Sequence, residues 1–265
     1  MINLLYPNGL QTWSPFWFFI TVTKMIKTKE YFAGTGSFSK VAKQFGCSIY
    51  RFELDPQHEA EEYNDICNVK EEKEFYDYAW FSPICTGFSV AAIGKNWHKE
   101  TKEPKTDSAR LSLKLLDKSI ELISQGKYKY WFIENPRGMC RVVIDKIFAK
   151  YGVTDYVRNT VTYCQYGDDR MKPTDIWTNC IAWKPKPPCK NGMPCHIAAP
   201  RGSTTGTQGI KGSVLRSVIP PAIFVEIFEQ TKNGMDNKME DQWKEFWKKE
   251  HGRDYETIGD ENENV

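Results

Sequence analysis

Short apolar runs alternate with amphipathic stretches along the first half of the chain. The run at 29–33 is aromatic and leads into a Gly-Thr-Gly turn. Residues 37–46 then place Val41 and Phe45 four positions apart, on one face of a helix that a glycine ends. A second strand is expected at 47–52. The order of strand, glycine turn, helix and strand predicts a βαβ unit with parallel strands.

Two further apolar, aromatic runs flank the longest predicted helix. The run at 78–82 ends in a Pro-Ile-Cys loop, and the run at 128–133 ends in Glu-Asn-Pro. The segment between them, 107–125, is amphipathic. Its buried stripe is predicted to contain Leu113, Leu116, Ile120 and Ile123. The alternation favours an α/β fold, in which the carboxyl ends of parallel strands share one edge where ligands bind.

The first turn and the acids that follow it fit a nucleoside ligand. Gly34 and Gly36 allow a ligand to approach the backbone, and Glu53, at the end of the second strand, is placed to bond ribose hydroxyls. Position 39 is Ser, so the dinucleotide pattern G-x-G-x-x-G is absent. Asp65 follows a polar, helix-like stretch at 58–63 and is a candidate for an adenine amino group. A purely structural turn explains two glycines equally well.

A cysteine and a glutamate are expected at the same edge of the sheet. Cys85 lies just past a strand in a Pro/Gly loop, and Glu134 ends the next strand because Pro136 biases Asn135 away from helix. A single free cysteine is usually a small buried hydrophobe, and a single strand-end acid is usually solvated. Together they predict a nucleophile, an acid and a nucleoside pocket in one cleft.

From about residue 29 to 230 the chain resembles the cytosine-C5 DNA methyltransferases, with the motifs in family order. The amino-acid sequences of 163–179 and 189–209 most resemble those of small solitary enzymes of phages and prophages. The motifs that carry the resemblance are Phe32-Ala33-Gly34-Thr35-Gly36, Glu53, Asn64-Asp65-Ile66, Ser82-Pro83-Ile84-Cys85, Glu134-Asn135, Tyr166-Gly167 with Arg170-Met171-Lys172, and Arg216 with Ile219-Pro220-Pro221.

The resemblance implies a Rossmann-like sheet that binds S-adenosylmethionine, with a short, loop-rich target-recognition lobe. It implies that Cys85 adds to C6 of a cytosine, that Glu134 bonds N3 and the exocyclic amine, and that Arg170 holds the base or a phosphate. The cytosine must be flipped out or single-stranded. The implied cofactor contacts are Phe32, Ala33, Gly34, Thr35, Gly36, Glu53, Asp65, Ile66, Ser82 and Pro83.

Two departures from the family pattern keep alternatives open. Ile84 replaces the second proline before the cysteine, and Lys172 stands where a second arginine is usual, although lysine cannot form the same bidentate fork. A nucleic-acid-binding protein with a degenerate cofactor site is therefore one alternative. The same reaction on RNA, such as tRNA, is another, because these residues do not determine the polymer.

The chain is long enough for one sizeable core and a small additional lobe, with 265 residues of which 40% are hydrophobic. We divide it into an N-terminal extension (1–24), a catalytic, cofactor-binding domain (25–180), a short basic target-recognition segment (181–212), a return to the catalytic domain (213–232), and a C-terminal helix with an acidic tail (233–265).

The segments 1–24 and 233–265 are predicted to lie outside the catalytic domain. The apolar run at 13–22 lacks the flanks of a secretory signal. It is also shorter than the roughly 18 residues that span a membrane, so we expect no membrane partner. One interpretation is that Met25 is the native start. Near the other end, residues 236–250 place Met239, Trp243, Phe246 and Trp247 at helical spacing, which predicts a helix docked on the body.

The recognition segment is basic over a long range. No Asp or Glu occurs from 176 to 225, which favours binding to DNA phosphates, although a solvated basic loop is the simpler alternative. Few residues are available to read bases, so a short target is expected. The segment at 90–106 is expected to be a mobile loop that closes over the flipped base. The basic candidates for DNA contact are Lys184, Lys186, Lys190, Arg201, Lys211 and Arg216.

Eight irregularly spaced cysteines predict a reduced, intracellular protein. The resemblance to phage and prophage enzymes implies the cytoplasm of a bacterial or phage-infected cell, and we expect a monomer. Cys189, Cys195 and His196 are candidate zinc ligands, with Cys164 and Cys180 upstream as further thiols. Their spacing is not that of a standard zinc finger, so ordinary structural thiols are the alternative.

Overall fold

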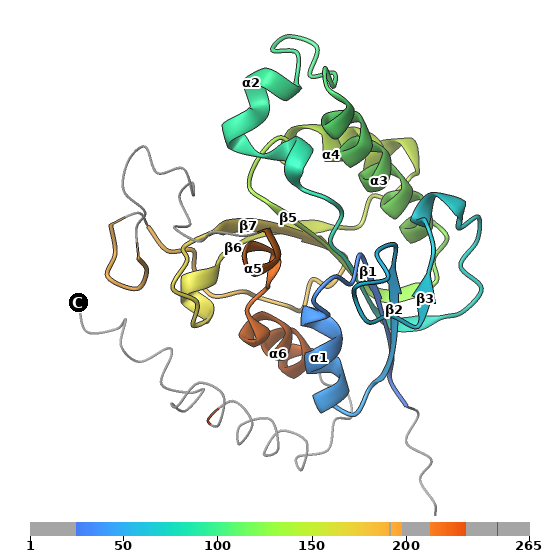
Figure 1. The fold of residues 1–265 in the computed structure, drawn as a ribbon. Helices are drawn as coiled ribbons and strands as arrows, with labels where there is room; N and C mark the ends of the chain where they lie inside the picture. The colour runs from blue at the N-terminus through green and yellow to red at the C-terminus, as the bar shows by residue number, and fades with distance from the viewer. Residues whose placement is uncertain (1–24, 191, 198–212, 232–247, 249–265) are drawn as a thin grey trace, which may run out of the picture.

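The computed structural model describes residues 25–190, 192–197, 213–231 and 248 (Figure 1). Several expectations lie outside this part of the chain. They concern the extension at 1–24, the basic candidates Arg201 and Lys211, and the C-terminal helix with its acidic tail.

The core of the protein is one seven-stranded sheet with the strand order β3-β2-β1-β4-β5-β7-β6. All neighbouring strands are parallel except β7, which runs antiparallel to both β5 and β6. This order with a reversed β7 is that of the Rossmann-like sheet of S-adenosylmethionine-dependent methyltransferases, as the sequence predicted. The strands are β1 (Lys27–Tyr31), β2 (Ser48–Glu53), β3 (Glu62–Tyr63), β4 (Tyr76–Phe81), β5 (Tyr128–Pro136), β6 (Val157–Thr162) and β7 (Pro173–Thr178).

Helices cover both faces of the sheet, as Figure 1 shows. On one face, α3 (Asp107–Ser124) and α4 (Cys140–Lys150) pack on one apolar cluster, and on the other, α1 (Ser37–Gln44) and α6 (Pro221–Gln230) pack on a second. Alternate side chains of β4 enter the two clusters because a strand has a period of two: Trp80 joins the α1–α6 side and Phe81 the α3–α4 side. The central strands are therefore buried on both faces, as is usual for parallel sheets.

Polar groups determine where the main helices begin. Thr106 caps α3, because its Oγ1 accepts a hydrogen bond from Ala109 N at 3.3 Å. Helix α1 has no side-chain cap of its own. Instead, the carboxylate of Glu30 on β1 accepts from Phe38 N at 3.1 Å and Ser39 N at 2.9 Å. Burial raises the pKa of Glu30 to about 7, although these hydrogen bonds lower it.

The short helical elements lie in the connections around the sheet edge. They are η1 (Ile66–Asn68), η2 (Thr86–Phe88), η3 (Val90–Ala92), α2 (Ile93–Asn96), η4 (Tyr163–Tyr166) and α5 (Ser213–Ser217). No helix in the described ranges is long and apolar enough to span a membrane.

The structure corrects three local expectations. Residues 58–63 are not helical: they form a turn followed by the two-residue strand β3. Strand β5 does not end at 133 but continues to Pro136, because β7 pairs with its free side beyond the end of β4. The segment at 90–106 is not all loop, because it contains η3 and α2; that it moves to close over a base stays a prediction. Trp97 is buried, stacks on Phe88, and donates from Nε1 to the carbonyl of Gly87 at 2.7 Å.

Candidate active site

The glycine turn after β1 is tied to the acid at the end of β2. Gly34 and Gly36 have φ values of 47° and 67°, and even Phe32 has a φ of 57°, a conformation that costs energy for a large side chain. The backbone N–H of Gly34 donates to Glu53 Oε2 at 2.7 Å. The turn therefore needs glycine for its backbone conformation, and it holds the Glu53 carboxylate at the carboxyl end of the sheet.

Asp65, the second acid of the proposed nucleoside site, belongs to the same edge. The N–H of Asn64 donates to the carbonyl of Glu53 at 2.9 Å, which brings the next segment beside the second strand. Asp65 caps η1 because its Oδ1 accepts from Cys67 N at 2.9 Å, and Ile66 is buried in the core. The cofactor candidates from β1, β2 and the 64–66 stretch thus follow adjacent strands.

The cysteine loop after β4 is held from several sides. The N–H of Ser82 donates to the carbonyl of Tyr31 at 3.4 Å, and the side-chain amide of Asn135 donates to the carbonyl of Pro83 at 3.1 Å. Gly87 is packed so closely against α3 that an added Cβ would lie 2.6 Å from Ser112 Oγ. Cys85, between these anchors, is exposed. The Asn135 contact acts on Pro83, so the loop is fixed without a second proline.

Glu134 is buried on β5, directly beyond the last residue pair that β5 forms with β4, Ile133 with Phe81. Its Oε1 accepts a hydrogen bond from the hydroxyl of Tyr163 at 3.2 Å. Burial raises the pKa of Glu134, while the charge of Lys172 and the hydroxyl of Tyr163 lower it. A buried carboxyl with a raised pKa is suited to proton donation as well as acceptance.

The Glu134 carboxylate acts electrostatically on the Cys85 thiol. Desolvation in the loop raises the pKa of the Cys85 thiol, and the Glu134 carboxylate raises it further. The charges of Lys172 and Arg216 act in the opposite direction. The structure therefore places a thiol, a carboxyl and two cations around one position at the carboxyl edge of the sheet.

Arg170 and Lys172, two residues apart, are used differently. The guanidinium of Arg170 pairs with Asp168. It also donates to the backbone carbonyls of Leu215, Arg216 and Val218. The guanidinium that sequence reasoning assigned to the base or phosphate thus holds the α5 segment in place.

Lys172 is the buried cation beside the carboxyl. Its Nζ lies 3.3 Å from the hydroxyl of Tyr163 and 2.9 Å from the carbonyl of Arg216. Burial lowers the pKa of Lys172, while Glu134 and Cys85 raise it. Sequence reasoning treated this lysine only as a departure from the family. The signal that points to it is the Arg-x-Lys spacing.

Four of the basic candidates lie in the described part of the chain, and they differ in exposure. Lys184 and Lys190 are exposed, whereas Lys186 is half-buried and its backbone N–H donates to the hydroxyl of Tyr166 at 2.9 Å. Burial lowers the pKa of Lys186. Arg216 lies on α5, near enough to Cys85 for its charge to lower the pKa of that thiol.

Four of the five candidate metal ligands lie close together in the structure. Cys189, Cys195 and His196 converge with Cys164, the upstream thiol on η4. Cys180 is fully buried in the apolar cluster on the α1–α6 face, away from this group.

Comparisons with known proteins agree with this picture at the level of the family. No family model matches the chain. A Frog virus 3 protein assigned as a DNA (cytosine-5)-methyltransferase is 28% identical over 223 residues, which cover 76% of this chain and 97% of the viral protein.

Solved structures with a similar fold are more distant. A protein encoded within an E. coli prophage and assigned as a DNA modification methyltransferase has a TM-score of 0.43 and 17% identity, over 58% of this chain and 46% of that one. The Dnmt2 methyltransferase of S. pombe has a TM-score of 0.42 and 14% identity, over 58% and 49%. The chain therefore spans about half the length of these structures. In its ordered motifs, its strand order and its viral relative, the chain is similar to the cytosine-C5 DNA methyltransferases.

Proposed function

We propose that the chain transfers a methyl group from S-adenosylmethionine to C5 of cytosine in DNA. The observation that carries the proposal is the pair formed by the exposed Cys85 thiol and the buried Glu134 carboxyl, at the edge that also holds the Gly34 turn. The assignment of the viral relative as a DNA (cytosine-5)-methyltransferase supports both the reaction and the polymer.

The residues at the first three strand ends fit the proposed cofactor. S-adenosylmethionine supplies an electrophilic methyl group and carries a ribose and an adenine. Glu53 Oε2 already accepts from Gly34 N, and a carboxylate oxygen has a second lone pair that a ribose hydroxyl can use. Asp65 uses Oδ1 to cap η1, so Oδ2 is the oxygen proposed for the adenine amine. The proposed contact set is Phe32, Ala33, Gly34, Thr35, Gly36, Glu53, Asp65, Ile66, Ser82 and Pro83.

The proposed chemistry needs both a nucleophile and an acid because C5 of cytosine is itself a weak nucleophile. The Cys85 thiolate would add to C6, and C5 of the resulting enamine would take the methyl group as the S–CH3 bond of the sulfonium breaks, leaving S-adenosylhomocysteine. Glu134 bonds N3 and the exocyclic amine and stabilises the charge that develops there. The C5 proton then leaves to a base and the Cys85–C6 bond breaks. Because Glu134 is buried, the target base must leave its stack to reach it.

Tyr163 and Lys172 are proposed to position the acid. The Lys172 ammonium, the Tyr163 hydroxyl and the Glu134 carboxylate form a continuous row, with separations of 3.3 Å and 3.2 Å. The ammonium favours the ionised forms of both the carboxyl and the Cys85 thiol. This arrangement offsets part of the cost of forming a thiolate in the pocket.

The decisive experiment measures transfer of a labelled methyl group to DNA and to tRNA, with 5-methylcytosine identified in the product. We expect label in DNA. Cys85→Ser is expected to lower the rate by at least about 10³-fold, because an alcohol is a far weaker nucleophile than a thiolate. Cys47→Ser makes the same chemical change in the core beside α1, and its rate per folded molecule should match the unchanged protein.

The other outcomes distinguish the alternatives. Label in tRNA alone would assign the same chemistry to RNA. Nucleic-acid binding with no transfer to either polymer would indicate a degenerate cofactor site. Normal methylation by Cys85→Ser would show that the nucleophile is wrong.

A further inference from the structure

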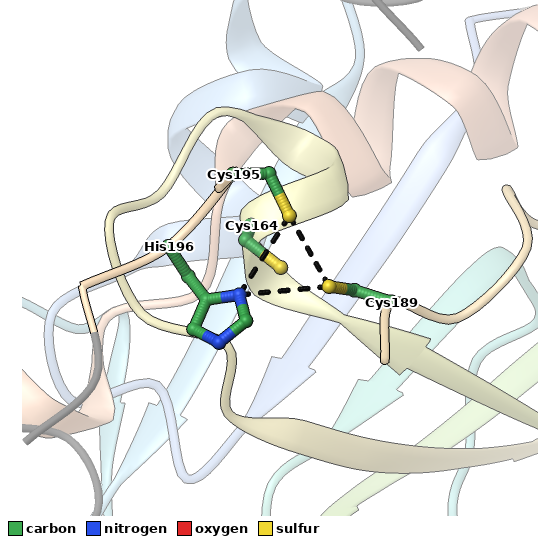
Figure 2. A group of neighbouring side chains, drawn as sticks. All are labelled: Cys164, Cys189, Cys195 and His196. Atoms are coloured by element: carbon green, nitrogen blue, oxygen red, sulfur yellow. Dashed lines mark hydrogen bonds between the residues drawn. The ribbon is translucent and has the colours of Figure 1, made fainter. Parts of the chain in front are cut away.

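A second group of reactive side chains lies outside the pocket. Cys164 comes from η4, whereas Cys189, Cys195 and His196 come from the segment that follows β7. Figure 2 shows the four side chains pointing toward one another, and their ligand atoms all lie within 4.8 Å of one another. Cys164 is buried and the other three are half-buried.

We propose that these four residues bind one structural zinc ion. Three thiolates and one imidazole form one of the standard closed sets for zinc, with no position left for a substrate. Tetrahedral zinc with bonds of about 2.3 Å to sulfur and about 2.0 Å to nitrogen separates its ligand atoms by roughly 3.5–3.8 Å. His196 Nδ1 lies 3.5 Å from Cys189 Sγ and 3.7 Å from Cys195 Sγ.

The shortest separation in the group distinguishes zinc from its main alternative. The sulfurs of Cys189 and Cys195 are 3.1 Å apart, which is much longer than a disulfide bond of about 2.05 Å. The separation is closer to the edge of a zinc tetrahedron than to a covalent bond. A disulfide would also leave Cys164 and His196 without a role, whereas zinc uses all four side chains.

The backbone around the ligands is already held in place. Cys189 N donates to Thr162 Oγ1 at 2.8 Å, and Ile197 N donates to the carbonyl of Asp169 at 2.9 Å. The side chain of Gln165 donates to Cys195 Sγ at 3.6 Å. The ligands are therefore preorganised between β6, η4 and the following loop, which lowers the entropic cost of assembling the site.

The proposed ion would join two parts of the protein with different roles. Cys164 is next to Tyr163, whose hydroxyl donates to Glu134. The other three ligands lie in the segment 184–197, which also carries the basic candidates Lys184, Lys186 and Lys190. Three thiolates, one neutral imidazole and Zn²⁺ have a net charge of −1. The ion would therefore act by anchoring the basic segment to η4 rather than by binding phosphate.

The first test measures the metal directly and does not depend on methyl transfer. The full chain is purified under mild reduction without chelators, and its metals are measured by mass spectrometry. We expect about one zinc per chain. Replacement by Co²⁺ should give the visible absorption of tetrahedral cobalt with thiolate ligands. Less than about 0.1 zinc per chain, together with no cobalt spectrum after reconstitution, would overturn the proposal.

Variants then assign the ligands. Cys189→Ser and His196→Ala should each lower the zinc content strongly and weaken or shift the cobalt bands. Cys67→Ser is the matched control, because Cys67 is half-buried like Cys189 but lies at η1, and it should keep its zinc. Zinc retained by a Cys189→Ser, His196→Ala double variant would contradict the assignment. A Cys189–Cys195 disulfide in freshly purified, zinc-free protein, detected by alkylation and peptide mass, would do so as well.

Discussion

The Cys85 pocket and the segment 184–197 are built in different ways. At the Cys85 site, the proposed reacting groups lie on β5 and in the loop that follows β4, so the pairing of these two strands determines where they lie. In the described part of 184–197 there is no strand or helix, and the chain is held by single contacts such as Lys186 N to the Tyr166 hydroxyl. Strand pairing therefore positions the Cys85 site, whereas single hydrogen bonds to side chains position the basic segment.

The charges in the two regions are also in different environments. Glu134 and Lys172 are buried, so they act on each other and on Cys85 through a medium of low dielectric constant. Lys184 and Lys190 are exposed, so solvent and salt screen them. Removal of one charge should therefore have a large effect in the pocket and a small, salt-dependent one in the segment.

The largest effect on stability is expected at Arg170, which ties the loop before β7 to residues 215–218. Arg170→Ala removes the guanidinium that pairs with Asp168 and leaves the carbonyls of Leu215 and Val218 without their side-chain donor, whereas the carbonyl of Arg216 keeps Lys172. We expect the free energy of unfolding to fall by about 3 kcal/mol, measured by urea denaturation. Arg158→Ala, at an exposed arginine on β6, is the control and should change it by less than about 0.5 kcal/mol.

The same variant tests the role that the sequence suggested for Arg170. If Arg170→Ala unfolds at the same urea concentration as the unchanged protein but loses methyl transfer, the guanidinium acts on the base or phosphate. Loss of stability with transfer retained by the folded fraction would support the structural role.

The part of the site that the sequence predicted depends on local order along the chain. The glycine turn at Gly34, the acid at Glu53 and the loop at Cys85 each follow an apolar strand, and parallel strands bring such positions to one edge. The strand and turn signals are contained within a few residues. The geometry of that edge then follows from the topology rule without any long-range contact being known.

The rest depends on pairings between distant segments. Strand β5 extends to Pro136 only because β7, about forty residues later, pairs with it. Strand β3 has two residues, too few for a periodic pattern. Cys164 joins the other metal candidates through folding of η4 against the later loop, so its spacing in sequence does not predict it.

The next largest effect is expected on the methyl-transfer rate, when the buried charge of Lys172 is removed. Lys172 lowers the pKa of the Cys85 thiol, so Lys172→Met should raise this pKa and reduce the thiolate fraction at neutral pH. We expect a methyl-transfer rate on the order of tenfold lower at neutral pH, about 1.4 kcal/mol in the barrier. The rising limb of the rate–pH profile should move to higher pH, so part of the rate returns in alkaline buffer.

A conservative variant separates charge from packing at this position. Lys172→Arg keeps the positive charge, so the rising limb of its rate–pH profile should stay near the pH found for the unchanged protein. If Lys172→Met lowers the rate by the same factor at every pH, the lysine acts through packing against Tyr163 rather than through the thiol pKa.

The smallest effect is expected on DNA affinity, when one exposed lysine charge is removed from the basic segment. Lys190→Gln is expected to weaken DNA binding by no more than about 1 kcal/mol and to reduce the slope of log affinity against log salt by about 0.9, the value for one phosphate contact. The rate at saturating DNA should not change, because the pocket is held by the sheet. Lys146→Gln, at an exposed lysine on α4, is the matched control and should leave the slope unchanged. An unchanged slope for Lys190→Gln would show that the segment is a solvated loop rather than a DNA contact, and a large fall in the rate would show that the two regions are not independent.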